Sequence, residues 1–354
     1  MAFTTVDNPE LYFQAKTYSG NGGTQSITLD GSENMQPDWV WLKKRNGSAN
    51  HHLVDSVRGA GRYVFSNLTN AEGGDGTGLL TSFNSDGFTL DTGADSNASG
   101  ATGVGWCWKA GTSFSNDASA TGIGSIDSSG SVLTDAGFSI ISYTGTGSNA
   151  TVAHGLGSIP QVYILKNRSS SAGWTSYFEP LGNTKFLQLD TNSAAGTATE
   201  AFNNTSPTSS VFSIGTDTST NNNTDNFIAY CFAEKKGYSK FGSYTGNGNA
   251  DGAFVYTGFR PAWFLVKNSA ASEHWRIYDN KRDSSNHMFR CLFPNENSAE
   301  NTTDNASEEI DFLSNGVKIR SSAQQLNGSG HTLVFMAFAE SPFVNSSGVP
   351  NNGR

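Results

Sequence analysis

The sequence predicts an all-β protein made of three tandem, homologous, antiparallel β-sandwich units of jelly-roll-like character. Two observations lead to this fold class. A strand-like core with Pro at its start and Lys six residues later occurs three times, at 37–43, 160–166 and 261–267. Self-similarity on this scale indicates repeated structural units. Within each copy the apolar residues alternate with a period of two, and the short runs end at Gly or Asn, which is typical of sandwiches.

Landmarks on both sides of each core define the units. A Tyr followed by two alternating glycines precedes each core, at Tyr18, Tyr143 and Tyr244, and a closing apolar run follows it. These starts are roughly 100 residues apart, which is the usual size of a small domain. The predicted order is an N-terminal arm (1–14), unit one (15–111), a Ser/Gly-rich linker (112–131), unit two (132–236), unit three (237–342) and a C-terminal tail (343–354).

The core segments predict where the central strands lie. Residues 39–42, 162–165 and 263–266 are apolar on both faces. Strands of this kind lie inside a sheet and are covered on both sides. The pairs Asp86-Gly87 and Asn315-Gly316 are typical of tight hairpin turns, so we expect a strand on each side of both pairs.

Composition and charge exclude several classes of protein. The 354 residues carry a net charge of −9, and no basic cluster is present that could follow a phosphate backbone, so we expect no nucleic-acid partner. The apolar runs are shorter than the roughly 20 residues that cross a bilayer. The first residues, Met1–Thr5, lack the basic and apolar layout of a signal peptide. We therefore expect no membrane insertion and no export through a signal peptide.

An Asp with an Arg three residues later occurs at one repeat position in two units. The pairs are Asp55 with Arg58 and Asp279 with Arg282, whereas unit two has Phe178-Glu179 there. One interpretation is a polar ligand-binding site. The alternative is a turn in which Asp accepts main-chain N–H groups and pairs with Arg, because short polar side chains favour such turns.

A second repeat position carries Trp174 in unit two, Trp275 in unit three and His51 in unit one. Exposed aromatic rings on equivalent surfaces could stack on sugar rings. Core packing is the alternative, because aromatic side chains bury large apolar areas. The change from Trp to His favours exposure of this position in unit one. The candidate ligand-binding residues are therefore His51, Trp174, Trp275, Asp55, Arg58, Asp279 and Arg282.

Metal, cofactor and catalytic patterns give little support for an enzyme. Cys107 and Cys231 share a repeat position with Ala337, so that position needs a small apolar side chain, and Cys291 stands alone. The histidines show no zinc-ligand spacing, and no cofactor or catalytic motif occurs. The oxygen-rich segment 216–225 lacks the closing carboxylate of a calcium loop, which leaves a weak calcium site open. We expect no enzymatic activity and no cofactor.

Several stretches form a distinctive set. They are Pro37-Asp-Trp-Val-Trp-Leu-Lys43, Asp55-Ser-Val-Arg-Gly59, Ser82-Phe-Asn-Ser-Asp-Gly-Phe-Thr-Leu90, Gly105-Trp-Cys-Trp-Lys-Ala-Gly111, Gly242-Ser-Tyr-Thr-Gly-Asn-Gly248, Gly258-Phe-Arg-Pro-Ala-Trp263 and Phe338-Ala-Glu-Ser-Pro-Phe-Val344. Together they resemble a family of bacteriophage virion proteins, best known from marine phages, that occur in tail-fibre-like and other structural proteins. The resemblance implies synthesis in the host cytoplasm, a place in the virion, and other virion proteins as partners. It implies no ligand and no catalytic residue.

Three hypotheses of function follow. The first is a tail fibre or related appendage that attaches to a glycan or protein of the host surface, where repeated weak contacts gain avidity. The second is a purely structural protein that decorates the capsid or connects parts of the tail, with its N-terminal arm docked on the virion. The third and most remote is a glycan depolymerase. A homotrimer is typical of fibre proteins, whereas three units in one chain could supply a threefold body alone.

Overall fold

The computed structural model describes residues 4–74 and 79–351, and it confirms the predicted all-β, antiparallel class. The described α-helices are single turns: α1 (Ala94–Asn97), α2 (Ala118–Thr121), α3 (Thr199–Phe202), α4 (Thr218–Asn221) and α5 (Gln324–Asn327). Two 3-10 turns, η1 (Pro9–Leu11) and η2 (Glu179–Leu181), complete the helical elements of these residues. No helix among them is long and apolar enough to cross a membrane.

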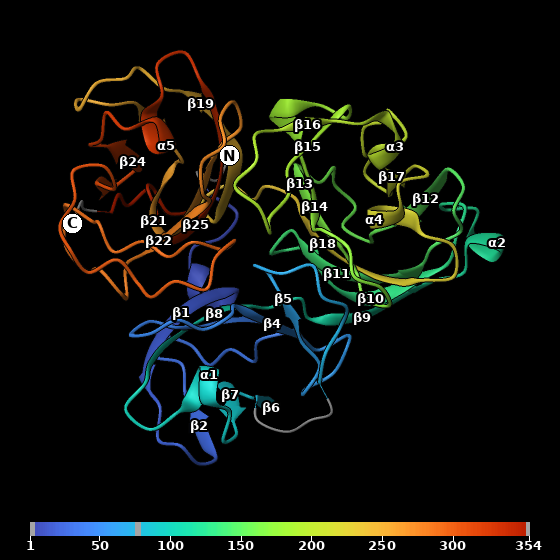
Figure 1. The fold of residues 1–354 in the computed structure, drawn as a ribbon, viewed down its shortest axis with the longest axis horizontal. Helices are drawn as coiled ribbons and strands as arrows, with labels where there is room; N and C mark the ends of the chain where they lie inside the picture. Colours follow the sequence, from blue (N-terminus) through green and yellow to red (C-terminus); the bar gives the residue numbers. More distant parts are fainter. Residues whose placement is uncertain (1–3, 75–78, 352–354) are drawn as a thin grey trace.

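Three lobes surround a common centre in Figure 1, and each lobe corresponds to one of the predicted units. We refer to residues 15–111, 132–236 and 237–342 as units one, two and three. In unit one the large sheet has the order β1 (Phe13–Ser19), β8 (Thr102–Trp108), β3 (Trp39–Lys44), β4 (His52–Asp55) and β5 (Val64–Phe65). Its small sheet has the order β2 (Gln25–Ile27), β7 (Gly87–Leu90) and β6 (Leu80–Asn84).

Units two and three have sheets of the same kind. The large sheet of unit two has the order β14 (Thr175–Phe178), β13 (Val162–Asn167), β18 (Asn226–Phe232), β11 (Phe138–Thr144), β10 (Ser128–Leu133) and β9 (Thr112–Asn116). Its short sheets pair β12 (Ala150–Ala153) with β17 (Val211–Ile214) and β15 (Lys185–Phe186) with β16 (Gly196–Thr197). Unit three has β19 (Ser239–Thr245), β25 (Thr332–Pro342), β21 (Phe259–Asn268) and β22 (Arg276–Asp279) in one sheet, and β20 (Phe254–Tyr256), β24 (Gly316–Ile319) and β23 (Ile310–Leu313) in the other.

The three predicted central strands are confirmed. They are β3, β13 and β21, and each lies between two other strands of its large sheet. Their apolar residues are buried on both faces. Both predicted hairpins are also present, since Asp86 lies in the turn between β6 and β7 and Asn315 lies between β23 and β24.

The segment 112–131 is not the linker that its composition predicted. Residues 112–116 form β9 and residues 128–133 form β10, and both strands extend the large sheet of unit two. The turn between them contains α2, whose N-terminus is capped by Asp117. Serine alternates with Phe114 and Gly130 in these strands, so a period of two was present under a composition typical of linkers.

The first and last described segments of the chain touch each other. In the N-terminal arm Val6 is buried, and Thr4 Oγ1 donates to the main-chain carbonyl of Lys236 at 2.6 Å. The main-chain N–H of Ser346 in the C-terminal tail donates to Asp7 Oδ1 at 2.7 Å. We call this contact of Asp7 with Ser346 the terminal clasp. The remainder of the predicted arm and tail, residues 1–3 and 352–354, lies outside the described residues.

Four hydrophobic cores hold the structure together. Units one, two and three each enclose their own core between the large sheet and the smaller strands. The fourth, which we call the central core, is formed by residues of all three units. All seven tryptophans of the chain belong to the central core: Trp39, Trp41, Trp106, Trp108, Trp174, Trp263 and Trp275. The units are therefore packed into one body and are not separate beads.

Candidate functional site

The Asp–Arg pair of unit one is buried where units one and two meet, and we call such a contact between two units a seam. Arg58 Nε donates to Asp55 Oδ2 at 2.5 Å, and neither side chain is exposed. Tyr230 of unit two donates its hydroxyl to the same carboxylate at 2.8 Å. Arg58 lies 3.6 Å from Glu72, which is bound by Arg168 of unit two at 2.8 Å. The pair thus joins two units through alternating charges.

The pair of unit three makes the equivalent seam with unit one. Arg282 Nε donates to Asp279 Oδ2 at 2.5 Å. Trp106 of unit one donates its indole N–H to the same oxygen at 2.9 Å. Arg282 also pairs with Glu300 at 2.9 Å, and Glu300 pairs with Arg45 of unit one at 2.8 Å. Burial alone would lower the pKa of Arg282, but the Asp279 and Glu300 carboxylates raise it above its ordinary value.

The seam between units two and three lacks this charged set. In the seam between units one and two the charged set consists of Asp55, Arg58, Glu72, Arg168 and Tyr230. The equivalent positions between units two and three carry, in the same order, Phe178, Leu181, Ala195, Ser269 and Met336. Phe178 and Met336 belong to the central core, and Leu181 and Ala195 pack against it. Buried ion pairs can be replaced by well-packed apolar groups, but removing a single partner leaves an uncompensated charge. We therefore expect the five positions to behave as one set.

The two candidate tryptophans also lie at seams. Trp174 donates its indole N–H to the main-chain carbonyl of Phe65 in unit one at 2.8 Å. Trp275 donates to the equivalent carbonyl of Gln188 in unit two at 2.9 Å. Both side chains are at most 1% exposed. Trp174 thus joins unit two to unit one, and Trp275 joins unit three to unit two in the same way.

His51 is buried at the third equivalent position, so its predicted exposure is wrong. Its Nδ1 accepts the indole N–H of Trp41 at 2.9 Å. Within the described part of the chain its Nε2 lacks a hydrogen-bond partner, although the Phe293 carbonyl of unit three is near enough to favour the protonated ring. Burial nevertheless lowers the pKa of His51 well below its ordinary value, so the ring is neutral. His51 thus occupies the same buried position as Trp174 and Trp275, but it lacks the hydrogen bond that each indole N–H donates to the neighbouring unit.

The repeated Lys of each core completes the seams. The three side chains are buried, and each ammonium donates to a main-chain carbonyl of the neighbouring unit: Lys43 to Asn297 at 3.2 Å, Lys166 to Thr69 at 2.8 Å and Lys267 to Asn192 at 3.2 Å. Burial lowers the pKa of Lys43 and Lys166 to about 8 and that of Lys267 to about 7. These lysine contacts join unit one to unit three, unit two to unit one, and unit three to unit two. The three units therefore form a closed ring.

Raising the pH from 7 to 8.5 is expected to stabilise the fold. The pKa values of the three lysines are lowered in the folded state, so the unfolded chain binds more protons across this interval. The free energy of unfolding should therefore rise, by on the order of 2 kcal/mol. Urea unfolding at both pH values measures the change, and Lys267→Met should reduce it by about half, because Lys43 and Lys166 still contribute. A free energy that stays level or falls in the wild type would contradict the lowered pKa values.

All seven candidate ligand-binding residues are thus corrected to a structural role. None is more than 8% exposed, and each lies at a seam. They are His51, Trp174, Trp275, Asp55, Arg58, Asp279 and Arg282. The alternative interpretations of a capped turn and of core packing describe them better, because Asp55 and Asp279 also accept the main-chain N–H of the Arg three residues on.

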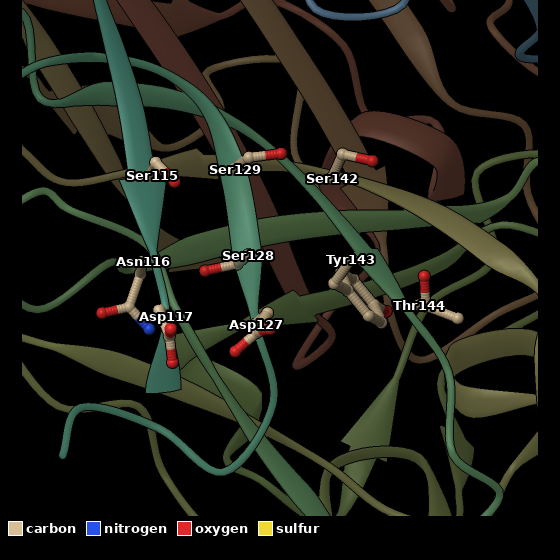
Figure 2. A pocket seen from close by; sticks show the side chains of 9 residues that line it. All are labelled: Ser115, Asn116, Asp117, Asp127, Ser128, Ser129, Ser142, Tyr143 and Thr144. Atoms are coloured by element: carbon tan, nitrogen blue, oxygen red, sulfur yellow. The ribbon is translucent and has the colours of Figure 1, made fainter. Parts of the chain in front are cut away.

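An accessible site lies on the strands of the segment 112–133. Ser115, Ser129 and Ser142 stand opposite one another in register on β9, β10 and β11. Figure 2 shows their side chains in one row across the three strands. They line an open hollow of about 280 Å³, which we call the serine groove. Its other lining residues are Asn116, Asp117, Asp127, Ser128, Tyr143 and Thr144.

The serine groove continues toward unit one. A second hollow, of about 420 Å³, shares Ser129 and extends past Ser131 to Asp38 and Ser56. Asp38 has a structural role there, because it accepts the main-chain N–H groups of residues 110 and 111 and the hydroxyl of Ser56. Together the two hollows cross the face of the sheet beside the seam between units one and two.

The polar groups of the serine groove differ in availability. Ser115 and Ser129 are exposed, and neither hydroxyl has a hydrogen-bond partner among the described residues. Ser142 accepts a hydrogen bond from Arg168 at 3.3 Å. Asp117 accepts from the Ser119 hydroxyl and a main-chain N–H, and these hydrogen bonds lower its pKa. The groove therefore offers free hydroxyls, each able to donate and accept, beside an ionised carboxylate.

Metal and thiol chemistry find no support in the described residues. They contain no group of three His, Cys, Asp or Glu side chains that could hold a metal ion. Cys107, Cys231 and Cys291 are free and buried, and burial raises the pKa of each thiol. In the segment 216–225, Asp217 caps α4 by accepting the Ser219 N–H. At least one side-chain oxygen of this segment therefore caps the local helix α4.

One family model matches the chain, over residues 8–342, and its description is Domain of unknown function (DUF7483). The match spans all three units, including the closing strand of each. No curated protein matches the sequence. The geometry of the groove and of the seams therefore carries the functional argument.

Proposed function

The chain belongs to the DUF7483 family. From the resemblance of its motifs to phage virion proteins, together with the geometry of the serine groove, we propose that it is a non-enzymatic phage virion protein that attaches to a host-surface glycan. The observation that carries this proposal is the serine groove, an open row of three serine hydroxyls on one sheet, of which those of Ser115 and Ser129 have no hydrogen-bond partner among the described residues. The hydroxyls repeat at the spacing between strands, about 4.8 Å, which is the scale of one sugar ring. Such groups can donate to and accept from sugar hydroxyls.

The state of Asp117 in the groove favours binding over cleavage. A glycosidase needs a carboxylic acid whose pKa is raised, so that it can protonate the leaving oxygen. In the groove, hydrogen bonds lower the pKa of Asp117 and keep it ionised. Release of reducing ends from host polysaccharide by the purified protein would nevertheless revive the depolymerase hypothesis.

The seams supply the rigidity that an attachment protein needs. All three units use the same kind of surface to contact each other, so one chain forms the threefold body that a homotrimer would otherwise form. We expect a monomer of 37.6 kDa in solution, measured by light scattering. Residues of the N-terminal arm pack on the body of their own chain, which leaves that part less suited to docking on other virion proteins.

The proposed function is tested by binding of the purified protein to host cells. Attachment predicts that it binds cells and blocks infection, and that pretreating the cells to remove their surface polysaccharide abolishes binding. Binding only to phage particles stripped of this protein would instead support the decoration or connector hypothesis and overturn ours.

Ser129→Leu is expected to weaken binding to cells at least about tenfold, because it removes the central hydroxyl and fills the groove with an apolar side chain. The fold should change little, since substitutions of exposed residues usually alter stability by less than about 0.5 kcal/mol. The matched control is Ser26→Leu, an exposed strand serine in unit one. Equal binding by wild type and Ser129→Leu would exclude the groove as the site.

A further inference from the structure

The outer face of the small sheet in unit three carries two exposed aromatic rings. Phe254 is 46% exposed and Tyr256 is 58% exposed, and both lie on β20. Val255 between them points into the core of the unit. β20 is an edge strand of its sheet. Exposed apolar side chains on an edge strand are usually avoided, because they invite aggregation, unless they serve a partner.

The other two units provide an internal comparison. Ile27 in β2, Val152 in β12 and Val255 in β20 pair with equivalent inward residues of the neighbouring strand. The positions on either side of them therefore correspond. Where unit three has Phe254 and Tyr256, unit one has Ser26 and Thr28 and unit two has Thr151 and Ala153. The sandwich does not need aromatic residues there, so the pair is specific to unit three.

Local packing explains only part of this pair. The ring of Phe254 lies over Gly316 on the facing strand, so close that a Cβ at Gly316 would be 2.9 Å from it. An aromatic ring that covers a cross-strand glycine is a known stabilising arrangement. Tyr256 has no such role, since its ring only borders Gly258 and remains the more exposed of the two.

A pocket with polar and apolar lining lies beside Tyr256. It has a volume of about 320 Å³, and its lining combines Tyr256, Lys240, Glu234 and Thr4 of the N-terminal arm with Phe343 and Val344 of the C-terminal tail. Lys240 pairs with Glu234 at 2.7 Å, and about a third of each side chain is exposed. The pocket therefore places a charged donor and a charged acceptor near an aromatic side chain.

We propose that Tyr256, Phe254 and this pocket form a second glycan-binding site, which we call the aromatic site. A pyranose ring has an apolar face of C–H groups that can stack on Tyr256, while its hydroxyls reach Lys240 and Glu234 through charge-assisted hydrogen bonds. The volume suits one or two sugar rings. The inference rests on the proposed function, because it assigns the same class of ligand to a second surface.

Two linked sites on one rigid body would act together. The serine groove lies on unit two and the aromatic site on unit three, so a polysaccharide long enough to reach both surfaces would be held at two points. Binding at the first site raises the effective concentration at the second without a new type of contact. The gain should be lost when the ligand is too short to reach both sites.

Tyr256→Ala tests the aromatic site against an array of immobilised bacterial surface polysaccharides. We expect about tenfold weaker binding, whereas Tyr256→Phe should retain the stacking face and bind within about threefold of wild type. Thr28→Ala, at the equivalent position of unit one, is the matched control and should bind as wild type. Thermal unfolding of all variants separates loss of binding from loss of fold.

The outcomes distinguish the two proposals. A wild-type protein that binds no polysaccharide would overturn the proposed function and the aromatic site together. Normal binding by Tyr256→Ala, with weaker binding by Ser129→Leu, would overturn the aromatic site alone. Association of wild-type chains that Tyr256→Ala abolishes, with no change in polysaccharide binding, would show that the edge strand serves a second copy of the chain and would also overturn it.

Discussion

Asp279→Ala is expected to destabilise the fold by about 3–5 kcal/mol, which is the cost of removing one partner from a buried ion pair. Asp279 is fully buried and accepts hydrogen bonds from Arg282 and from Trp106 of unit one. Without it the Arg282 guanidinium keeps only Glu300 as a charged partner, and the Trp106 N–H is left unpaired in the central core. The seam between units one and three therefore loses attraction, and two buried N–H groups, Arg282 Nε and Trp106 Nε1, lose their acceptor.

Urea unfolding at pH 7, followed by tryptophan fluorescence, measures this loss. Every tryptophan lies in the central core, so the signal reports on the ring as a whole. Asp304→Ala, at an exposed position of unit three, is the control and should change stability by less than about 0.5 kcal/mol. A loss below about 1 kcal/mol for Asp279→Ala would mean that the pair contributes little to the seam.

Transferring the apolar set of one seam to another should restore stability that a single change removes. In the seam between units one and two, Asp55→Phe alone leaves Arg58 buried without its carboxylate and should cost more than about 3 kcal/mol. The fivefold variant, which adds Arg58→Leu, Glu72→Ala, Arg168→Ser and Tyr230→Met, reproduces the residues found between units two and three. We expect it to unfold within about 2 kcal/mol of wild type.

This prediction separates a modular seam from a locally adapted one. The fivefold variant should be more stable than Asp55→Phe under the same unfolding conditions, although it carries more changes. If it is equally unstable or worse, the apolar set depends on other residues of its own seam, and the five positions do not form a transferable unit.

The local features of the fold could be predicted because they are written in short stretches of sequence. Alternating residues marked β7 and β24, and the pairs Asp86-Gly87 and Asn315-Gly316 marked the turns before them. Segments apolar on both faces marked β3, β13 and β21. Each of these signals depends only on neighbours in the chain, so no knowledge of tertiary contacts was needed.

The seams could not be predicted in this way, because the partner of each polar group lies in another unit. Asp55 and Arg58 were interpreted within unit one, whereas the hydroxyl that completes the pair comes from Tyr230. One signal was available in the repeats. Unit two lacks the Asp–Arg pair. In unit three, which faces it, Met336 stands at the position where the other units have the donors Trp106 and Tyr230. Coordinated loss at distant repeat positions indicates contact between the units.

The serine groove was missed for a different reason. Two of its three strands, β9 and β10, begin in 112–131, where Ser and Gly are so frequent that composition indicated a linker. In Ser113-Phe114-Ser115 and Ser129-Gly130-Ser131 the hydroxyls recur at every second residue, which places them on one face of a strand. Periodicity was the better guide than composition here, since β9 and β10 gain their stability by pairing with a sheet that already exists.

The terminal clasp brings the first and last described segments together, so we expect the fold to tolerate a different order of the units along the polypeptide. Because Asp7 and Ser346 already touch, a short peptide could join residue 346 to residue 7 without disturbing any seam. New ends could then be opened near residue 236, where unit two passes into unit three. Such a circularly permuted chain would begin with the third lobe and finish with the second, yet assemble the same three contacts.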